Sequence, residues 1–567
     1  MNRQQRMSPD QGGLLRLPEE ILLQILGYFT EPANKWHDSN KWRYPNELRA
    51  NHPNGLQNAR LACRRLNEVL SPLLCPVVTV NLESCSLHHA DMLSRNALIA
   101  KGIRGLEINL RYRSSRLAAD ICQYHVHVVR KFVDDAYREC DWHTEFQSYE
   151  DEDESPEATK HRAYQKAERV FELYSKHWRE YVEQPHADRL VDVQEDQSTV
   201  RANQRLLQEF FDSYAERHDD QLRIVSDGSF VRTLVEVISR LKNVPFIWFT
   251  DSDQFRFSVG HDVFELSSNK DSLCRRMEAA HNWLEIESLH DTGTDLYPVR
   301  ILTDLPIACH EAAIQLKGLS VGCFPLTKGF EYLLPGSATT DVASEAWARF
   351  TVACQSLEKF HFGMNGMSCT PFRPNGFTPS HRLFIDRFTG AACSGPNLEH
   401  LCLSMTPFRL TDGRHASSKP DQHYRAGSIL NSLTSTRLLE LQILSVQIDS
   451  IELEAAIDRL SSSARSIFLT GITLEHGQYA NAMAALQQKV ARSQLQVEFN
   501  SLEGAEFGPA TKFVDDGCFG LTLDEESRED YWERLEEHMN PMLLKRTLEW
   551  IRNGQGRANP LGETSCS

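Results

Sequence analysis

The sequence lacks an excess of positive charge. Its 567 residues include 61 Lys and Arg against 78 Asp and Glu, which gives a net charge of -17 at pH 7. A protein that binds nucleic acid by neutralising phosphates needs the opposite balance. The composition therefore argues against nucleic acid as a partner.

Long apolar runs are also missing. No stretch approaches the roughly 20 apolar residues of a membrane span, and the first ten residues, MNRQQRMSPD, lack the apolar core of a secretory signal. We expect an intracellular, soluble protein, in the cytoplasm and/or the nucleus, with no membrane partner.

Paired cysteine motifs are absent as well. Fourteen cysteines are scattered along the chain without a Cys-x-x-Cys pair, and Cys63, Cys354 and Cys402 lie inside apolar patterns. In this setting a cysteine behaves as a small buried hydrophobic residue. The pattern favours free thiols over disulfides or a zinc site.

Catalytic motifs with fixed spacing are not found. There is no phosphate-binding Gly-x-x-x-x-Gly-Lys-Ser/Thr loop, no Gly-x-Ser-x-Gly elbow and no His-Glu-x-x-His metal helix. The pairs His88/His89 and His125/His127 are too close in sequence to face one another on a helix, so surface histidines are the favoured interpretation.

One carboxylate pair, Asp251 and Asp253, follows a predicted strand. Aspartate at such a position accepts backbone hydrogen bonds in turns, which we favour over a catalytic pair. An enzyme that uses the 251 region is the less favoured alternative. The sequence predicts no catalytic residue, no cofactor and no metal.

Residues 14–80 carry the strongest local pattern. Pro18 suits a first helical turn, and Glu19 and Glu20 follow where the helix dipole favours negative charge. Ser71 and Pro72 are typical of the start of a third short helix, which Pro76 ends. The apolar face of the first predicted helix comprises Ile21, Leu22, Ile25, Leu26 and Phe29, and that of the second comprises Leu56, Ala59, Cys63, Leu66 and Leu70.

Together, Leu-Pro-x-Glu-Ile-Leu-x-x-Ile-Leu and Arg-Leu-x-Cys-Arg-Arg-Leu-Asn resemble an F-box in the variant typical of fungal F-box proteins. The resemblance implies docking onto the Skp-type adaptor of a cullin-based ubiquitin ligase. The adaptor-binding residues that it implies are Leu17, Pro18, Glu20, Ile21, Ile25, Leu26, Leu61, Cys63 and Leu66. Three helices of this size carry more apolar surface than they can bury alone. The alternative is that later segments of this chain cover that surface.

The segment departs from the family at one place. Residues 31–54 intervene between the first two helices, where the family has a few residues. An insertion costs little closure entropy, so the helix pair can survive it. It lies beside the expected adaptor surface, and it either folds aside or weakens docking.

Beyond Val77 a strand pattern recurs, with apolar residues at positions i, i+3 and i+5. It begins at Ile103, Val244, Leu316, Leu357, Leu398, Leu438 and Ala464. Several copies follow a helical segment, as at 230–241, 347–354 and 451–460. Helix followed by strand at a coarse period is typical of a solenoid, and the series resembles irregular leucine-rich repeats. An ordinary α/β domain with scattered strands is the alternative.

The predicted fold class is therefore α/β, an N-terminal three-helix F-box followed by an irregular helix-strand solenoid with a helical hairpin insertion. Predicted bounds are 1–13 for a disordered N-terminus, 14–76 for the F-box, 77–552 for the repeat domain with a helical insertion at 116–218, and 553–567 for a disordered tail. Loops are expected at 364–381 and 405–427 on one rim, and helix at 523–552. The insertion has two aromatic stripes, at 163–181 and 206–214, which we interpret as packing faces of the hairpin.

Two functions follow from this organisation. The first is a non-catalytic substrate receptor of a ubiquitin ligase, which binds the adaptor, and through it a cullin, with the F-box and an unknown target protein with the repeat domain. The second is an F-box scaffold that acts outside the ligase. Strand positions expected on the concave side, which include Lys359, His361, His400 and Gln442, identify no target.

Overall fold

The structure is a computed structural model. It describes residues 53–131, 165, 175–179, 182, 197–241, 246–252, 274, 277–289, 293–326, 328–333, 340–363, 379–406, 408, 424–493, 495–507, 541–554 and 558–561.

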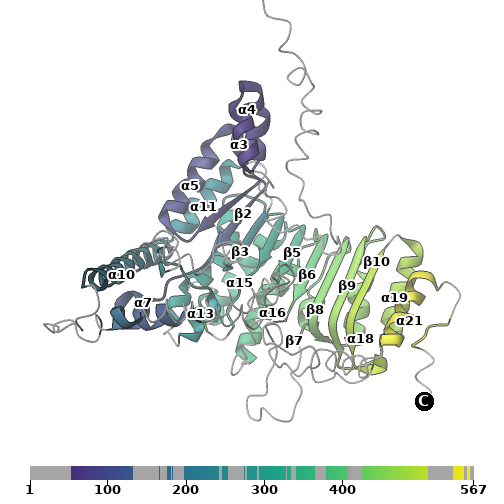
Figure 1. Ribbon diagram of the computed structural model, residues 1–567. Coiled ribbons are helices and arrows are strands. Elements are labelled where there is room, and N and C mark those ends of the chain that lie inside the picture. Colours follow the sequence, from purple (N-terminus) through teal and green to yellow (C-terminus); the bar gives the residue numbers. More distant parts are fainter. Residues whose placement is uncertain are drawn as a thin grey trace, which may run out of the picture.

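Ten parallel strands form one sheet (Figure 1). Nine of them lie side by side in chain order, with β1 and β10 at the two edges, and the short β7 pairs with β8. The strands are β1 (Val77–Asn81), β2 (Gly105–Asn109), β3 (Phe246–Thr250), β4 (Gly318–Val321), β5 (Lys359–Phe362), β6 (His400–Ser404), β7 (Tyr424–Arg425), β8 (Glu440–Ile448), β9 (Ser466–Leu474) and β10 (Gln496–Glu503).

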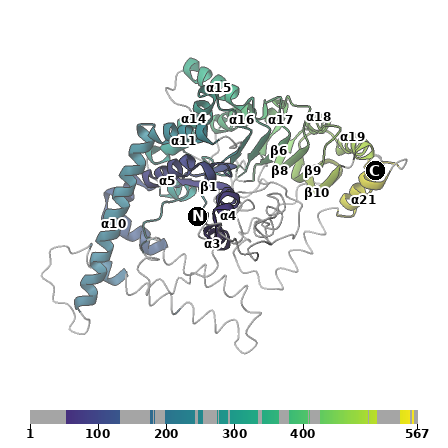
Figure 2. The same cartoon turned by 90° about the horizontal axis from the view of Figure 1, so that it is seen from above.

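Helices cover one face of this sheet. Successive helices contact each other in chain order, and Figure 2 shows them along the outer side of the strands. They are α5 (Ser84–Arg95), α11 (Ser229–Arg240), α14 (Ile301–Glu311), α15 (Thr340–Cys354), α16 (Pro379–Cys393), α17 (Gly427–Asn431), α18 (Ser450–Asp458), α19 (Tyr479–Arg492) and α21 (Pro541–Asn553). The prediction of a mixed α/β fold is confirmed.

The remaining helices lie at the N-terminal end, in the insertion and between β3 and β4. They are α3 (Pro53–Leu61), α4 (Arg64–Leu70), α6 (Ala97–Ala100), α7 (Ser115–Ala119), α10 (Gln197–Ser226) and α13 (Trp283–Ser288), with 3-10 turns at Ser71–Leu73, Gly293–Arg300, Phe330–Tyr332 and Ala505–Phe507.

The recurring apolar pattern builds the core between sheet and helices. Because side chains alternate between the two faces of a strand, the residues at i+3 and i+5 both point to the helical layer. In-register pairing stacks the i+3 residues into one buried row across the sheet. This row is Val78, Leu106, Ile247, Leu319, Phe360, Leu401, Leu441, Ile467 and Val497. The strands predicted from the pattern are thus confirmed.

Buried cysteines lie on both faces of the sheet. Of the three cysteines named from the sequence, Cys354 lies in the core between sheet and helices and Cys402 is buried on the opposite face, both as free thiols. Cys63 is only half-buried, because it caps α4 on the small N-terminal unit. Burial raises the pKa of the Cys402 thiol to about 12, so this cysteine is protonated at neutral pH and behaves as an apolar side chain.

The C-terminal end of the sheet is capped by α21. This helix packs against α19 and β10, and Arg552 donates a 2.7 Å hydrogen bond from its guanidinium to the carbonyl of Val497 on the edge strand. Beyond it, Leu561 is 1% exposed within the main core, and Asn559 donates to the carbonyl of Ala480. The tail predicted to be disordered from 553 therefore includes an ordered stretch, because an apolar residue anchors it.

The predicted second helix is divided into two. Helix α3 ends at Leu61 and α4 begins at Arg64, where Cys63 takes an extended conformation and its sulfur accepts a hydrogen bond from the Leu66 N–H. The predicted third helix is the 3-10 turn Ser71–Leu73, and its N-cap is Leu70 rather than Ser71. The predicted first helix lies outside the described residues.

The helical insertion has a core of its own. Trp178, from the first aromatic stripe, is buried with Leu207, Phe210 and Tyr214, from the second. This favours packing faces over a cofactor surface. Helix α10 continues to Ser226, eight residues past the predicted end at 218, because Ile224 and Val225 join the main core.

Two predicted loops are partly secondary structure. Helix α16 begins at Pro379, within the predicted loop 364–381, and β7 and the start of α17 lie within the predicted loop 405–427. The rest of both loops, residues 364–378 and most of 407–423, lies outside the described residues. Proline in a first helical turn explains the early start of α16.

Candidate functional site

Three of the predicted adaptor-binding residues are described. Leu61 is 75% exposed at the end of α3. Cys63 caps α4 and Leu66 packs against the buried pair Val69 and Leu70. The other six, Leu17, Pro18, Glu20, Ile21, Ile25 and Leu26, lie outside the described residues.

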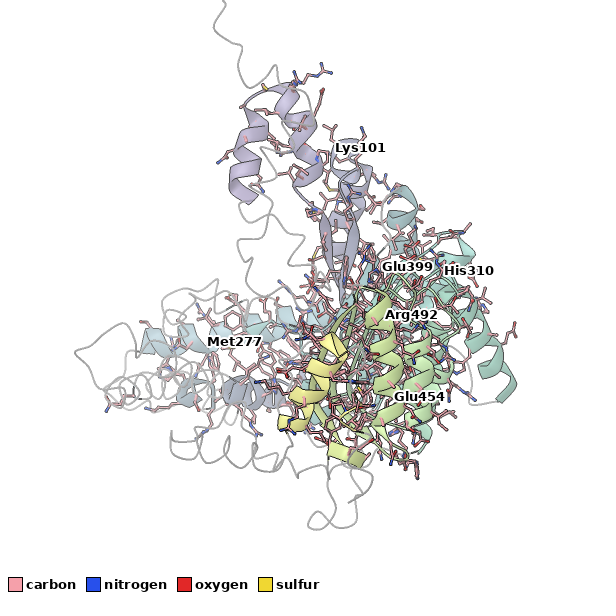
Figure 3. The ribbon with its side chains drawn as sticks, turned by 90° about the vertical axis from the view of Figure 1, so that its right-hand side faces the viewer. Lys101, Met277, His310, Glu399, Glu454 and Arg492 are labelled. Carbon is pink, nitrogen blue, oxygen red and sulfur yellow. The ribbon has the colours of Figure 1, made fainter. Side chains whose placement is uncertain are left out.

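The α3–α4 unit projects from the edge of the sheet. Figures 1 and 3 show it beyond β1 and Lys101, away from the layers that carry Glu399 and Arg492. Among the described residues its own core contains two buried apolar side chains, Val69 and Leu70, which form a cluster separate from the main core. This unit, with Leu61 exposed at its surface, is the first candidate for contact with another polypeptide.

A second candidate is the face of the sheet opposite the helical layer, which we call the polar face. It is formed by the strand positions that alternate with the core rows. Its central row is Thr79, Glu107, Trp248, Ser320, His361, Cys402, Gln442, Phe468 and Glu498.

Hydrogen bonds between neighbouring strands organise the polar face. Thr79 Oγ1 donates to Glu107 Oε2 at 2.9 Å, and at the other end Thr473 Oγ1 donates to Glu503 Oε2 at 3.1 Å. Such cross-strand pairs hold polar side chains in fixed positions on a sheet. The polar face therefore presents an ordered set of side chains along the strands.

Two of the predicted concave-side residues, His361 and His400, belong to such pairs. Ser320 Oγ lies 2.8 Å from His361 Nδ1, and burial lowers the pKa of His361 to about 4, so this imidazole is neutral at pH 7. His400 Nδ1 lies 2.9 Å from Glu440 Oε2, and this hydrogen bond holds the pKa of Glu440 below its ordinary value. The structure places all four predicted residues, with Lys359 and Gln442, on this face.

An aromatic patch on the polar face was not anticipated from the sequence. Trp248 and Phe246 lie on β3 with ring centroids 5.8 Å apart and planes tilted by 30°. A Cβ added to Gly105 would lie 2.0 Å from the Trp248 ring, and one added to Gly318 would lie 1.8 Å from the Phe246 ring. Each ring thus lies on a glycine of the adjacent strand.

The alternation of side chains between the two faces of a strand could have revealed this patch. In each predicted strand the residues between the apolar positions must point away from the core, and in β3 the residue between Ile247 and Phe249 is Trp248. A tryptophan at an outward position, with glycine at the neighbouring strand positions, is the signal.

Asp251 has a structural role at the end of β3. Its carboxylate accepts a 3.0 Å hydrogen bond from the backbone N–H of Trp283, at the start of α13. Burial raises its pKa to about 6. This agrees with the predicted backbone-binding role. Asp253 lies outside the described residues.

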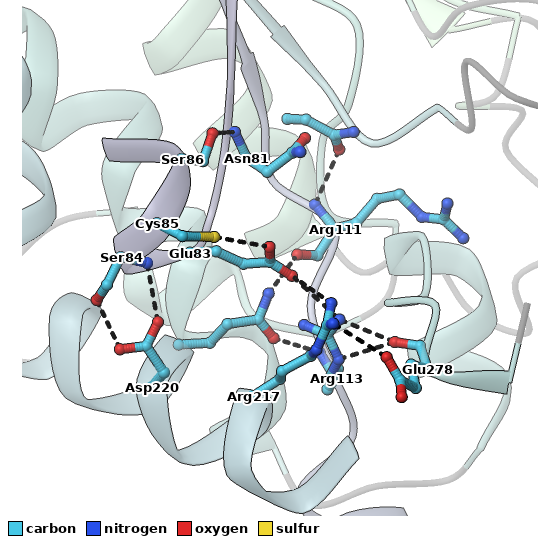
Figure 4. A network of polar contacts seen from close by, with 12 residues as sticks. Asn81, Glu83, Ser84, Cys85, Ser86, Arg111, Arg113, Arg217, Asp220 and Glu278 are labelled. Carbon is cyan, nitrogen blue, oxygen red and sulfur yellow. Dashed lines mark hydrogen bonds and ion pairs between the residues drawn. The ribbon is translucent and has the colours of Figure 1, made fainter. Parts of the chain in front are cut away.

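A buried polar network joins the insertion to the sheet (Figure 4). Arg113, which follows β2, lies 3.1 Å from Glu83 and donates two hydrogen bonds to the carbonyl of Glu278. Its backbone N–H donates to Gln221 on α10, and Asp220 on the same helix accepts from Ser84. The network fixes α10 against the carboxyl ends of β1 and β2, which is a structural role.

The prediction that both histidine pairs lie on the surface is correct for one pair and wrong for the other. His88 and His89 are exposed on α5, whereas His125 is buried and His127 half-buried, because the helix that carries them packs on α10 and on the 277–289 segment. The rings of His127 and His281 meet edge to face at 4.8 Å. Burial lowers the pKa of His127 to about 3 and that of His281 to about 4.

Among the described residues, Asp449, Glu475 and His476 have spacing compatible with a metal ion. His476 Nδ1 donates a 2.9 Å hydrogen bond to Asp449 Oδ1, and the His476 side chain is largely exposed. Glu475 forms an ion pair with Arg425. These partners already account for the cluster.

No family model, curated protein or solved structure matches this chain. No described helix has the length and apolar composition that crossing a membrane requires.

Proposed function

We propose that this chain is a substrate receptor of an SCF-type cullin ubiquitin ligase. Residues 14–76 form an F-box that binds a Skp-type adaptor, with an insertion at 31–54. The helix-strand array from 77 to 552 is an irregular leucine-rich-repeat-like solenoid that binds a target protein. The chain acts inside the cell, in the cytoplasm and/or the nucleus.

The observation that carries the proposal is the α3–α4 unit. It matches the second half of the F-box sequence pattern, projects from the array and leaves Leu61 75% exposed. Burying one leucine is worth about 1.5–3 kcal/mol, so exposure on a unit with so small a core favours a protein partner. Helix-in-groove docking uses apolar helix residues of this kind.

The array supports the second half of the proposal. Strands that pair in chain order, with helices that contact in chain order, are the arrangement expected of stacked repeats, in which each unit buries its apolar face against its neighbours. Repeat proteins use the extended strand face for binding. The polar face is therefore assigned to the target.

In this role the chain makes and breaks no bond itself. The adaptor and cullin hold the ubiquitin-transferring subunit, and this chain holds the target beside it. The rate gain comes from proximity, which raises the effective concentration of the two reactants. No cofactor and no metal are required of this chain.

Co-purification tests the assignment. Tagged full-length protein should capture the adaptor together with a cullin. Leu17→Ala/Pro18→Ala should abolish this capture, and Leu61→Ala should weaken it, since both remove apolar contacts with the adaptor groove. Capture of the adaptor without a cullin would favour the alternative, a scaffold that acts outside the ligase.

The matched control is Ile451→Ala. Ile451 is 76% exposed on α18, almost the same exposure as Leu61, but it lies on the helical layer of the array. Adaptor capture should be unchanged by this substitution. Equal capture by the wild type, the Leu17/Pro18 variant and Leu61→Ala would remove the F-box assignment.

A further inference from the structure

We propose that the adaptor presents an apolar groove bordered by carboxylates, and that these carboxylates pair with exposed arginines at the N-terminal end of the array. The basic residues of this end, which we call the basic end, are Arg60, Arg64, Arg65, Lys101 and Arg104. This inference rests on the proposed adaptor-binding role of the α3–α4 unit and names the chemistry of the surface that the unit meets.

The basic end is unusual in this acidic chain. Residues 53–82 and 96–106 contain these five cations and one carboxylate, that of Glu68, whereas the whole chain has a net charge of -17. The excess of positive charge is therefore local, and it coincides with the unit that projects from the array.

The two segments of the basic end are packed together. The Arg104 backbone N–H donates a 2.7 Å hydrogen bond to the carbonyl of Pro76. A Cβ added to Gly102 would lie 1.6 Å from the carbonyl oxygen of Pro72, so the connection before β2 lies directly on the turn that follows α4. Figure 3 shows Lys101 on the side of the array from which the α3–α4 unit projects. The five cations therefore belong to one end of the molecule.

The side chains of the basic end are open to solvent. Four of the five are exposed, and Arg60 is half-buried. The Arg64 side chain is 93% exposed, although its guanidinium forms a 2.9 Å ion pair with Glu68. An exposed pair one helical turn apart contributes little to stability. A carboxylate of a partner can therefore replace Glu68 at little cost to the fold.

Arg104 differs from its counterparts in the array. The residues before β4, β5 and β6 lie in register with it, and their charges are paired at 2.8 Å, Lys317 with Glu358 and Glu399 with Arg437. Arg104 is exposed, and no carboxylate in the described part of the chain pairs with it. A carboxylate from a partner would gain an ion pair here without breaking one.

The composition of the basic end favours carboxylates on a protein. Four of its five cations are arginines. A planar guanidinium pairs with a carboxylate through two parallel hydrogen bonds, and arginine is enriched at protein interfaces whereas lysine is depleted. Leu61, which is 75% exposed, follows Arg60 directly. An apolar anchor beside arginines fits an apolar groove with an acidic rim.

Phosphate-rich partners fit this end less well. Residues 53–82 and 96–106 contain no Phe, Trp or Tyr on which nucleic-acid bases could stack. The net charge of -17 also repels a nucleic acid or an anionic membrane at long range. An acidic protein groove is therefore the occupant that fits both the charge and the exposed leucine.

The test measures how fast the full-length protein associates with a purified Skp-type adaptor that carries a fluorescent label, by stopped-flow mixing. Complementary charges accelerate the encounter of two proteins, and salt screens this attraction. The association rate constant of the wild type should fall at least about tenfold as NaCl rises from about 0.05 M to about 0.5 M.

Variants locate the charges. Arg104→Glu and Arg64→Gln should each slow association about three- to tenfold at about 0.05 M NaCl and have little effect at about 0.5 M. The matched control is Arg492→Glu, at an exposed position on α19 away from the basic end. It changes the net charge as much as Arg104→Glu does, and its rate should stay within about twofold of the wild type. Equal rates at high salt show that a variant is folded.

The inference is overturned if the wild-type rate does not depend on salt, if Arg104→Glu and Arg492→Glu slow association alike, or if an RNA oligonucleotide binds the wild type more tightly than the adaptor does at low salt. A complex that forms in any of these cases leaves the proposed function intact. That function is tested by Leu17→Ala/Pro18→Ala, which should prevent the complex at every salt concentration. Absence of a complex with the wild type at all salt concentrations would overturn both.

Discussion

Replacing Asp251 with asparagine should stabilise the protein at neutral pH. Burial raises the pKa of this carboxyl from 3.8 to about 6. Each tenfold change in a protonation equilibrium is worth about 1.4 kcal/mol, so ionising Asp251 costs the folded state about 3 kcal/mol relative to the unfolded chain. Asparagine carries no charge and keeps an oxygen that accepts the Trp283 N–H.

The stability that Asp251→Asn adds depends on pH. Above pH 6 the carboxyl is ionised in both states and the full cost is present. As the pH falls from 6 to 3.8, the folded state takes up a proton before the unfolded state does, and the cost disappears. Asp251→Asn should therefore add up to about 3 kcal/mol of unfolding free energy at pH 7.5 and almost none near pH 3.8.

Urea unfolding followed by circular dichroism at the two pH values measures this gain. Asp251→Ala is the control, because it removes both the charge and the acceptor and leaves a buried N–H unpaired, which costs about 1–3 kcal/mol. The reasoning is refuted if Asp251→Asn is no more stable than the wild type at pH 7.5, or if its gain is as large near pH 3.8.

Three further outcomes are expected. Stability should fall as the pH drops from about 6.5 to 4, because the pKa values of His127 and His281 are lowered in the folded state and the unfolded chain therefore binds protons first. The melting temperature of His281→Leu should depend less on pH than that of the wild type, and an unchanged pH dependence would contradict this. Gly318→Ala should cost about 1–3 kcal/mol by displacing the Phe246 ring, and in a double-mutant cycle with Phe246→Ala that cost should vanish. Arg113→Met should lower stability by about 1–3 kcal/mol, since it removes the buried guanidinium that donates to the Glu278 carbonyl and pairs with Glu83. Denaturant midpoints equal to the wild type would contradict the role of the network.

The strands could be predicted from the sequence because their core-facing residues repeat. Leu357, just before β5, and Phe360 and Phe362 within it follow the pattern that most strands share, and all three are buried. β10 lacks it, since Gln494 stands where the first apolar residue is expected, and the two-residue β7 is too short for any pattern.

What the sequence could not provide depends on tertiary packing. The helical spacing of apolar residues continues from Ala59 through Cys63 to Leu66. The sequence pattern therefore does not indicate the break between α3 and α4. His125 is buried in the insertion, where its ring meets the ring of Trp178 edge to face, and the sequence does not indicate this long-range contact. The patch at Trp248 requires in-register pairing with β2 and β4, which places a glycine beneath each ring.

The most direct test of the account is the stoichiometry of a mixture of the purified full-length protein and a purified Skp-type adaptor, measured by size-exclusion chromatography with light scattering. We predict a one-to-one complex with the wild type and with Ile451→Ala, and separate components with Leu17→Ala/Pro18→Ala. Separate components with the wild type would contradict the account.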